Sequence, residues 1–111
     1  MADDSWSTIT ALAARFNEAD AALGVPTEEQ HVLQVLKIGE EFGEAAQAVI
    51  GAKGTNPRKG NSHTWDDVHA EVADTVITGM VTLARMRPDA AAYFADQLKL
   101  KAARFLAAET P

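Results

Sequence analysis

Apolar side chains recur every three or four residues along four segments of this 111-residue chain, which is the spacing of one helix face. The first segment covers about residues 5–23 and stops at the Gly24-Val25-Pro26 break. The second covers about residues 27–50, and Thr27 and Gln30 at its start have the spacing of a capping box. The apolar stripe of this second helix, which we expect to face the core, comprises Val35, Ile38, Phe42, Ala45 and Val49.

Two further helical segments lie beyond residues 51–63, where three glycines, a proline and two asparagines predict a loop. Thr64 and Asp67 have capping spacing, and the helix that they begin reaches about residue 86, before Arg87-Pro88. The last helix covers about residues 89–107. No segment alternates with period two, so the sequence predicts one all-α domain over residues 1–111. We expect an antiparallel four-helix bundle that is stabilised by oligomerisation.

Composition and charge narrow the classes of partner. The hydrophobic fraction of 47% is typical of a globular chain, and the formal net charge of −6 disfavours nonspecific binding to nucleic acid or anionic lipid. Disulfides and thiolate metal sites are excluded because the chain has no cysteine. The acidic start lacks the pattern of a signal peptide, and no stretch approaches the ~18 to 20 apolar residues of a membrane span. We therefore expect a cytoplasmic protein that binds neither nucleic acid nor membrane.

Two acidic motifs lie inside the second and third helical segments, Glu40-Glu41-Phe42-Gly43-Glu44 and Glu71-Val72-Ala73-Asp74. Residues three or four apart share a helix face, so each motif projects its carboxylates together. Most glutamate clusters are solvated surface, which is the simplest interpretation. At ~100° per residue, however, Leu33 and Leu36 lie within about 40° of Glu40, on the side opposite the main apolar stripe. A helix that is apolar on two sides is expected to be covered on both, by another helix, another subunit or a ligand.

The third helix also has a face that carries carboxylates. Its polar stripe comprises Thr64, Asp67, Glu71, Asp74, Thr78 and Arg85. Carboxylates that converge from two helices suit hard divalent cations with oxygen ligands, namely Mg²⁺ or Mn²⁺. A di-iron centre is disfavoured because neither motif contains a Glu-x-x-His pair, and zinc because no cluster of nitrogen or sulfur ligands is present. His31, His63 and His69 have no partner pattern and receive no role.

The two motifs resemble those of the MazG-like all-α nucleoside triphosphate pyrophosphohydrolases, whose pattern is Glu-Glu-x-x-Glu, a spacer and Glu-x-x-Asp. Here the pattern is Glu40-Glu41-x-x-Glu44, 26 intervening residues and Glu71-x-x-Asp74, within a resemblance that covers about residues 32–85. The resemblance implies a helical bundle that forms homodimers or homotetramers. It also implies Mg²⁺-dependent hydrolysis of a nucleoside or deoxynucleoside triphosphate at the α-phosphorus, which releases a nucleoside monophosphate and pyrophosphate.

Carried over by position, the resemblance assigns the Mg²⁺ ligands as Glu41, Glu44, Glu71 and Asp74, with Glu40 assisting beside Glu41 by orienting or deprotonating water. Cations are needed to hold the β- and γ-phosphates, because substrate and groove are both negative. Lys37 is the first choice, since it lies on the carboxylate face. The further candidates are Lys53, Arg58 and Lys59 in the loop region and, through the family pattern alone, Lys101 and Arg104. Many members have Asn where this chain has Lys101, so base recognition is not carried over.

Each of these assignments has a plainer alternative. Lys37 has the spacing of an ion pair with Glu40 or Glu41, and residues 51–63 suit either a lid over the site or a simple connector. Trp65 suits either stacking on a base or core packing. For the whole protein, two alternatives to the enzyme stay open. One is a noncatalytic all-α oligomeric module whose acidic groove binds a basic partner, and the other is a plain oligomeric bundle with its acidic faces outward.

Overall fold

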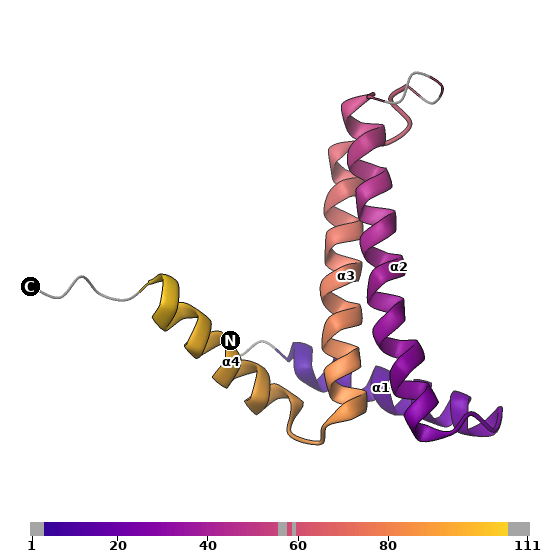
Figure 1. Ribbon diagram of the computed structural model, residues 1–111, viewed down its shortest axis with the longest axis vertical. Helices are drawn as coiled ribbons and strands as arrows, with labels where there is room; N and C mark the ends of the chain where they lie inside the picture. Colours follow the sequence, from indigo (N-terminus) through magenta and orange to yellow (C-terminus); the bar gives the residue numbers. More distant parts are fainter. Residues whose placement is uncertain (1–3, 56–57, 59, 107–111) are drawn as a thin grey trace, which may run out of the picture.

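The computed structural model describes residues 4–55, 58 and 60–106, and the regular structure of these residues is entirely α-helical. The four helices are α1 (Ser5–Ala22), α2 (Thr27–Lys53), α3 (Trp65–Met86) and α4 (Ala90–Phe105). The all-α class and the order of four helices are therefore confirmed. α2 and α3 form a long antiparallel hairpin, α1 crosses the hairpin near one end, and α4 extends away from it (Figure 1). Among the described residues, no helix has the length and apolar content that crossing a membrane requires.

The helix starts follow local capping chemistry, with one correction. At the start of α3, Thr64 Oγ1 accepts from the Asp67 amide at 3.2 Å, and Asp67 Oδ2 accepts from the Thr64 amide at 2.8 Å. The bond that the Thr64 amide donates to the carboxylate lowers the pKa of Asp67. The two bonds together confirm the predicted capping box. The box predicted at Thr27 is wrong, because Pro26 is the residue before the helix and Thr27 is already helical. The Gln30 side chain instead donates to the Val25 carbonyl at 2.8 Å.

α2 continues to Lys53, past the predicted end near residue 50. Gly51 was expected to open a loop, yet it is buried against Ser62 and His63, whose side chains a Cβ at this position would overlap. It therefore allows the returning chain to approach the helix closely. The helix ends at Lys53, and Gly54 follows it with a φ of 66°, the left-handed conformation common after a helix end.

Three of the five residues in the α2 stripe that was expected to face the core are exposed in a single chain. On α2, the exposed fractions of Val35, Phe42 and Val49 are 46%, 67% and 38%. On α3, Val72 and Val76 are exposed by 50% and 56%. At about 100° per residue, the α2 residues that face α3 lie roughly a quarter turn around the helix from the stripe that was expected to face the core. We define the back face as the exposed stripe made of Val35, Phe42, Val49, Val72 and Val76.

The buried core within one chain is small. Ile9, Ala13 and Val81 form its centre, and partly buried Trp6 and Met80 pack against it. The radius of gyration is 17.7 Å, whereas a compact domain of this size has about 13 Å. The four helices of one chain thus do not close around one core, and the predicted bundle packing is not confirmed.

A candidate metal centre between α2 and α3

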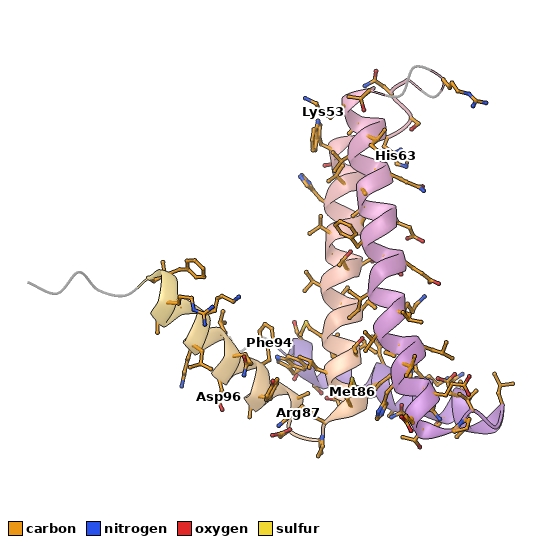
Figure 2. The ribbon with its side chains drawn as sticks, viewed as in Figure 1. Lys53, His63, Met86, Arg87, Phe94 and Asp96 are labelled. Carbon is orange, nitrogen blue, oxygen red and sulfur yellow. The ribbon has the colours of Figure 1, made fainter. Side chains whose placement is uncertain are left out.

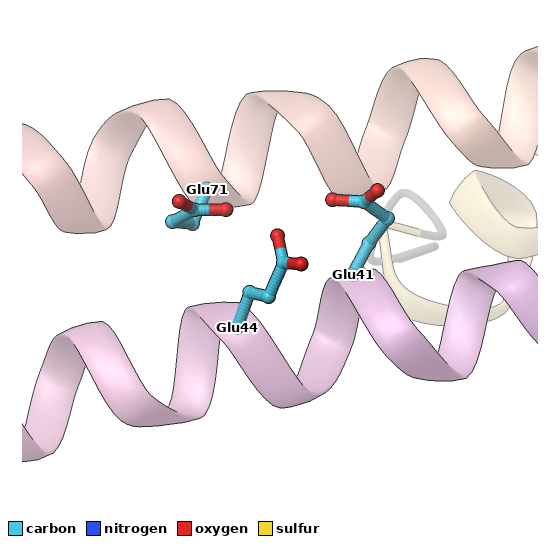
Figure 3. Close-up of side chains that lie close together, drawn as sticks. All are labelled: Glu41, Glu44 and Glu71. Atoms are coloured by element: carbon cyan, nitrogen blue, oxygen red, sulfur yellow. The ribbon is translucent and has the colours of Figure 1, made fainter.

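Three carboxylates from the two acidic motifs meet in the middle of the hairpin. Glu41 and Glu44 lie about one turn apart on α2, and Glu71 reaches toward them from α3 (Figure 3). One carboxylate oxygen of each residue lies within 4.8 Å of the others. This arrangement arises because the i, i+3 spacing on α2 points both glutamates toward α3. The structure therefore brings together three of the four metal ligands that the resemblance assigned.

One oxygen of this cluster lacks a partner. Glu71 Oε2 is buried and has no hydrogen-bond partner among the described residues. A buried carboxylate oxygen without a donor is costly, and nearly all such atoms in proteins are satisfied by a donor, a water or an ion. The two neighbouring carboxylates are themselves acceptors and cannot satisfy this oxygen, whereas a bound cation can. The donor set is all oxygen, which fits Mg²⁺ or Mn²⁺.

Within this cluster, Glu41 is the carboxylate whose pKa the fold clearly shifts. Its side chain is only 15% exposed. Burial raises its pKa, and the neighbouring carboxylates of Glu44 and Asp74 raise it further, against a lowering effect of Lys37. A raised pKa means that the charged form of Glu41 is held at a cost in the absence of a cation. Binding a divalent cation removes this cost, because it favours the deprotonated form.

The rim of the cluster is formed by Lys37, Glu40 and Asp74. Lys37 Nζ lies 3.8 Å from a Glu40 oxygen and 3.9 Å from a Glu41 oxygen, so its side chain is engaged in the ion pairs that were the plainer alternative. The Glu40 side chain is 72% exposed and lies on the solvent side of the cluster. Asp74 is exposed and lies outside the group of three, although it is near enough to Glu41 to raise its pKa.

The other predicted phosphate-binding cations lie away from the cluster or outside the described residues. Lys53 is nine residues beyond Glu44 on α2, about 13 Å along the helix axis. Arg58 lies in the α2–α3 connection, and Lys59 lies outside the described residues. Two more cations, Lys101 and Arg104, are carried by α4, which extends away from the hairpin (Figure 1). Among the candidate cations that the structure describes, only Lys37 therefore lies at the carboxylates of its own chain.

A buried polar network where α1 meets the hairpin was not foreseen. The Arg85 side chain is 5% exposed, and its Nη2 lies 2.6 Å from Asp20 Oδ2. Its other guanidinium hydrogen bonds reach Asn17 Oδ1 at 2.8 Å, Gln34 Oε1 at 2.6 Å and Gln30 Oε1 at 3.1 Å. Arg85 thus ties α1 and α2 to α3. One feature of the sequence could have indicated that Gln30 and Gln34 face α3. At about 100° per residue, both lie within about 20° of Glu41 around the α2 axis.

A pocket of about 380 Å³ opens where α1, α2 and α3 meet. Its walls are mainly apolar and include Phe16, Leu33 and Ile77, while Gln34 and Arg85 contribute polar groups. Lys37 lines the pocket and also pairs with Glu41. The pocket and the carboxylate cluster are therefore adjacent, and this volume lies in the range of pockets that hold small organic ligands.

Comparisons with protein-family models, curated proteins and solved structures find no match for this chain. They assign it to no family. The similarity of its acidic motifs to those of the MazG-like enzymes stays a prediction.

Proposed function

We propose that this protein hydrolyses a nucleoside or deoxynucleoside triphosphate at the α-phosphorus, in the manner of the MazG-like pyrophosphohydrolases that its motifs resemble. The observation that carries the proposal is the convergence of Glu41, Glu44 and Glu71 within 4.8 Å, with Glu71 Oε2 buried and lacking a partner among the described residues. Magnesium bound there supplies charge neutralisation of the phosphates and a water of lowered pKa. Asp74, one turn from Glu71, is the fourth ligand in the proposal.

The chemical step requires a base and a position for the water. A water oxygen bonds to the α-phosphorus, the bond from that phosphorus to the oxygen bridging the β-phosphorus breaks, and pyrophosphate leaves with the electron pair. Glu40 accepts the proton of the water, because its exposed carboxylate stands at the rim beside Glu41. Lys37 pairs with Glu40 and Glu41 in the metal-free protein and would bind the substrate phosphates once the carboxylates held a cation.

The adjacent pocket is the proposed location of the sugar and base. A triphosphate bound at the carboxylates places its nucleoside near Lys37, which also borders the pocket. Apolar walls at Phe16 and Ile77 suit the faces of a planar ring. Gln34 and Arg85 make one wall of the pocket polar. These features favour a ligand with an apolar surface and a polar edge over a bare polyphosphate.

We also propose that the functional unit is a homo-oligomer in which the back face is covered. Val35, Phe42 and Val49 recur every seven residues, which is the repeat of a helix-packing seam. Two hairpins joined by their back faces make a four-helix bundle and leave both carboxylate clusters accessible. This assembly accounts for the apolar residues that one chain leaves exposed.

The test is product analysis in ¹⁸O-labelled water. The purified protein is incubated with Mg²⁺ and each common and modified nucleoside or deoxynucleoside triphosphate. The expected products are pyrophosphate and a nucleoside monophosphate that carries the label. Orthophosphate, or label in pyrophosphate, contradicts attack at the α-phosphorus, and the absence of product with every nucleotide favours the noncatalytic module. Glu71→Gln is expected to lower turnover more than about 100-fold. The matched control is Glu18→Gln, at an exposed position of α1, which keeps full turnover.

A further inference from the structure

α4 is held at its first turn and uncovered beyond it. Arg87 donates from Nε and Nη2 to the Asp89 carboxylate at 2.9 and 3.1 Å, and its guanidinium lies 3.9 Å from the centre of the Tyr93 ring. Phe94 lies near the start of α4 (Figure 2). Its ring packs against Trp6 of α1, with ring centroids 5.8 Å apart. These contacts fix the direction in which α4 leaves the rest of the chain.

The remainder of α4 is amphipathic, and its apolar side is exposed. The exposed fractions of Phe94, Leu98 and Phe105 are 41%, 57% and 71%. At about 100° per residue these three residues lie within roughly 40° of one another, and Lys101 lies about 20° from Phe94. A helix of 16 residues in a protein gains most of its stability from the packing of its apolar face. The apolar side of α4 therefore requires a cover, and any surface that covers it also meets Lys101.

α2 carries a surface with the complementary properties. We define the front surface as Leu33, Leu36, Glu40 and Glu44, which share one side of the helix. Leu33 and Leu36 are exposed by 52% and 62%, beside carboxylates of the candidate metal centre. α2 and α3 together carry nine carboxylates against three cations, whereas α4 carries three cations against one carboxylate. Charge and apolar surface thus both match between α4 and the front surface.

The α4 of the same chain does not meet this surface. It leaves the Met86 end of the hairpin and extends away from α2 (Figure 1). The Arg87 and Trp6 contacts hold this direction. The available source of a matching helix is therefore a second copy of the chain.

We propose that α4 of one copy docks on the front surface of a second copy and completes its catalytic site. The apolar side of α4 covers Leu33 and Leu36, and Lys101 and Arg104 bind the β- and γ-phosphates of the substrate held by the second copy. The docking rests on geometry and charge alone, whereas the phosphate role rests on the function proposed above. The two parts have separate tests.

Photo-crosslinking tests the docking without any assay of activity. The photoreactive residue 4-benzoylphenylalanine replaces Leu98, which keeps that position apolar, and chains labelled with ¹⁴N and ¹⁵N are mixed before irradiation. The expected crosslinks join chains of different isotope and map to residues 33–44 of α2. The same residue placed at Asp96, on the opposite side of α4, is the matched control and gives no such crosslink. Crosslinks within one chain, crosslinks to other segments or none at all overturn the docking.

Complementation between two inactive variants tests the shared site. Glu41→Gln removes a metal ligand and leaves α4 intact, whereas Lys101→Ala/Arg104→Ala removes the cations of α4 and leaves the carboxylates intact. Each variant alone is expected to lose most turnover. A mixture of equal amounts is expected to recover about one quarter of wild-type turnover, if the chains exchange at random within two-fold symmetric dimers. A mixture with no recovery, from chains shown by mass to have exchanged, overturns the shared site. If the wild type itself lacks turnover, the proposed function fails, while the crosslinking result still decides the docking.

Discussion

Replacing Glu71 by Gln tests whether the buried carboxylate exists to hold a cation. In the metal-free protein, the change removes the charge of a group whose Oε2 lacks a partner among the described residues. The neutral amide can also donate to the carboxylates of Glu41 and Glu44, which lie within 4.8 Å. We therefore expect the metal-free variant to unfold at the same temperature as the wild type or a higher one, in contrast to most substitutions of a buried residue.

Magnesium is expected to reverse this order. At a concentration about 100 times its Kd, a cation that binds only the folded protein stabilises it by about 2.7 kcal/mol, or roughly 10 to 20 °C in Tm for a chain of this size. A hundredfold loss of affinity in Glu71→Gln leaves about 0.4 kcal/mol at the same concentration, or roughly 2 to 3 °C. Scanning calorimetry with and without Mg²⁺ measures both quantities, and Glu18→Gln is the control that keeps the full shift. An equal Mg²⁺ shift in the wild type and in Glu71→Gln refutes the reasoning.

Three further predictions use neighbouring groups. Lys37→Met removes the cation that lowers the pKa of Glu41, so Mg²⁺ titrations at a series of pH values should show binding lost at a higher pH than in the wild type. Because the fold raises the pKa of Glu41, the stability that this group contributes is fully present below pH 4.5, its ordinary pKa. That stability is lost as the pH rises through the pKa of the folded protein. The metal-free Glu41→Gln variant should therefore exceed the wild type in Tm by an amount that grows above pH 4.5, and a constant difference contradicts this. Arg85→Met leaves four acceptors of the buried network without a donor and should lower the free energy of unfolding by about 3 kcal/mol in urea. The exposed control Arg87→Met should cost much less, and equal losses count against the network.

The helices themselves follow from local sequence, because their signals act within a few residues. The capping pair Thr64 and Asp67 and the Arg87-Pro88 break lie where α3 begins and ends. Glu41, Glu44 and Glu71 could be predicted to converge, because one short connection joins two helices whose acidic residues are spaced by one turn. The convergence of these carboxylates is thus predictable from the two motifs and the connection between them, without reference to α1 or α4.

The rotation of α2 depends on distant partners and was not predictable from its own pattern. The stripe that includes Val35 and Phe42 has the strongest apolar period, yet α2 turns Gln30 and Gln34 toward α3. The reason is that Arg85, 51 residues beyond Gln34, pairs with both amides, and no periodicity in either helix reveals that pairing. The direction of α4 is likewise set by the packing of Phe94 against Trp6, which are 88 positions apart.

Diffraction from a crystal soaked in Mn²⁺, recorded where manganese scatters anomalously, locates the cation directly. We predict one or more anomalous peaks between α2 and α3, with oxygens of Glu41, Glu44 and Glu71 at about 2.0 to 2.3 Å. A fully soaked crystal whose anomalous map is empty at these three carboxylates contradicts the metal centre and, with it, the proposed hydrolase.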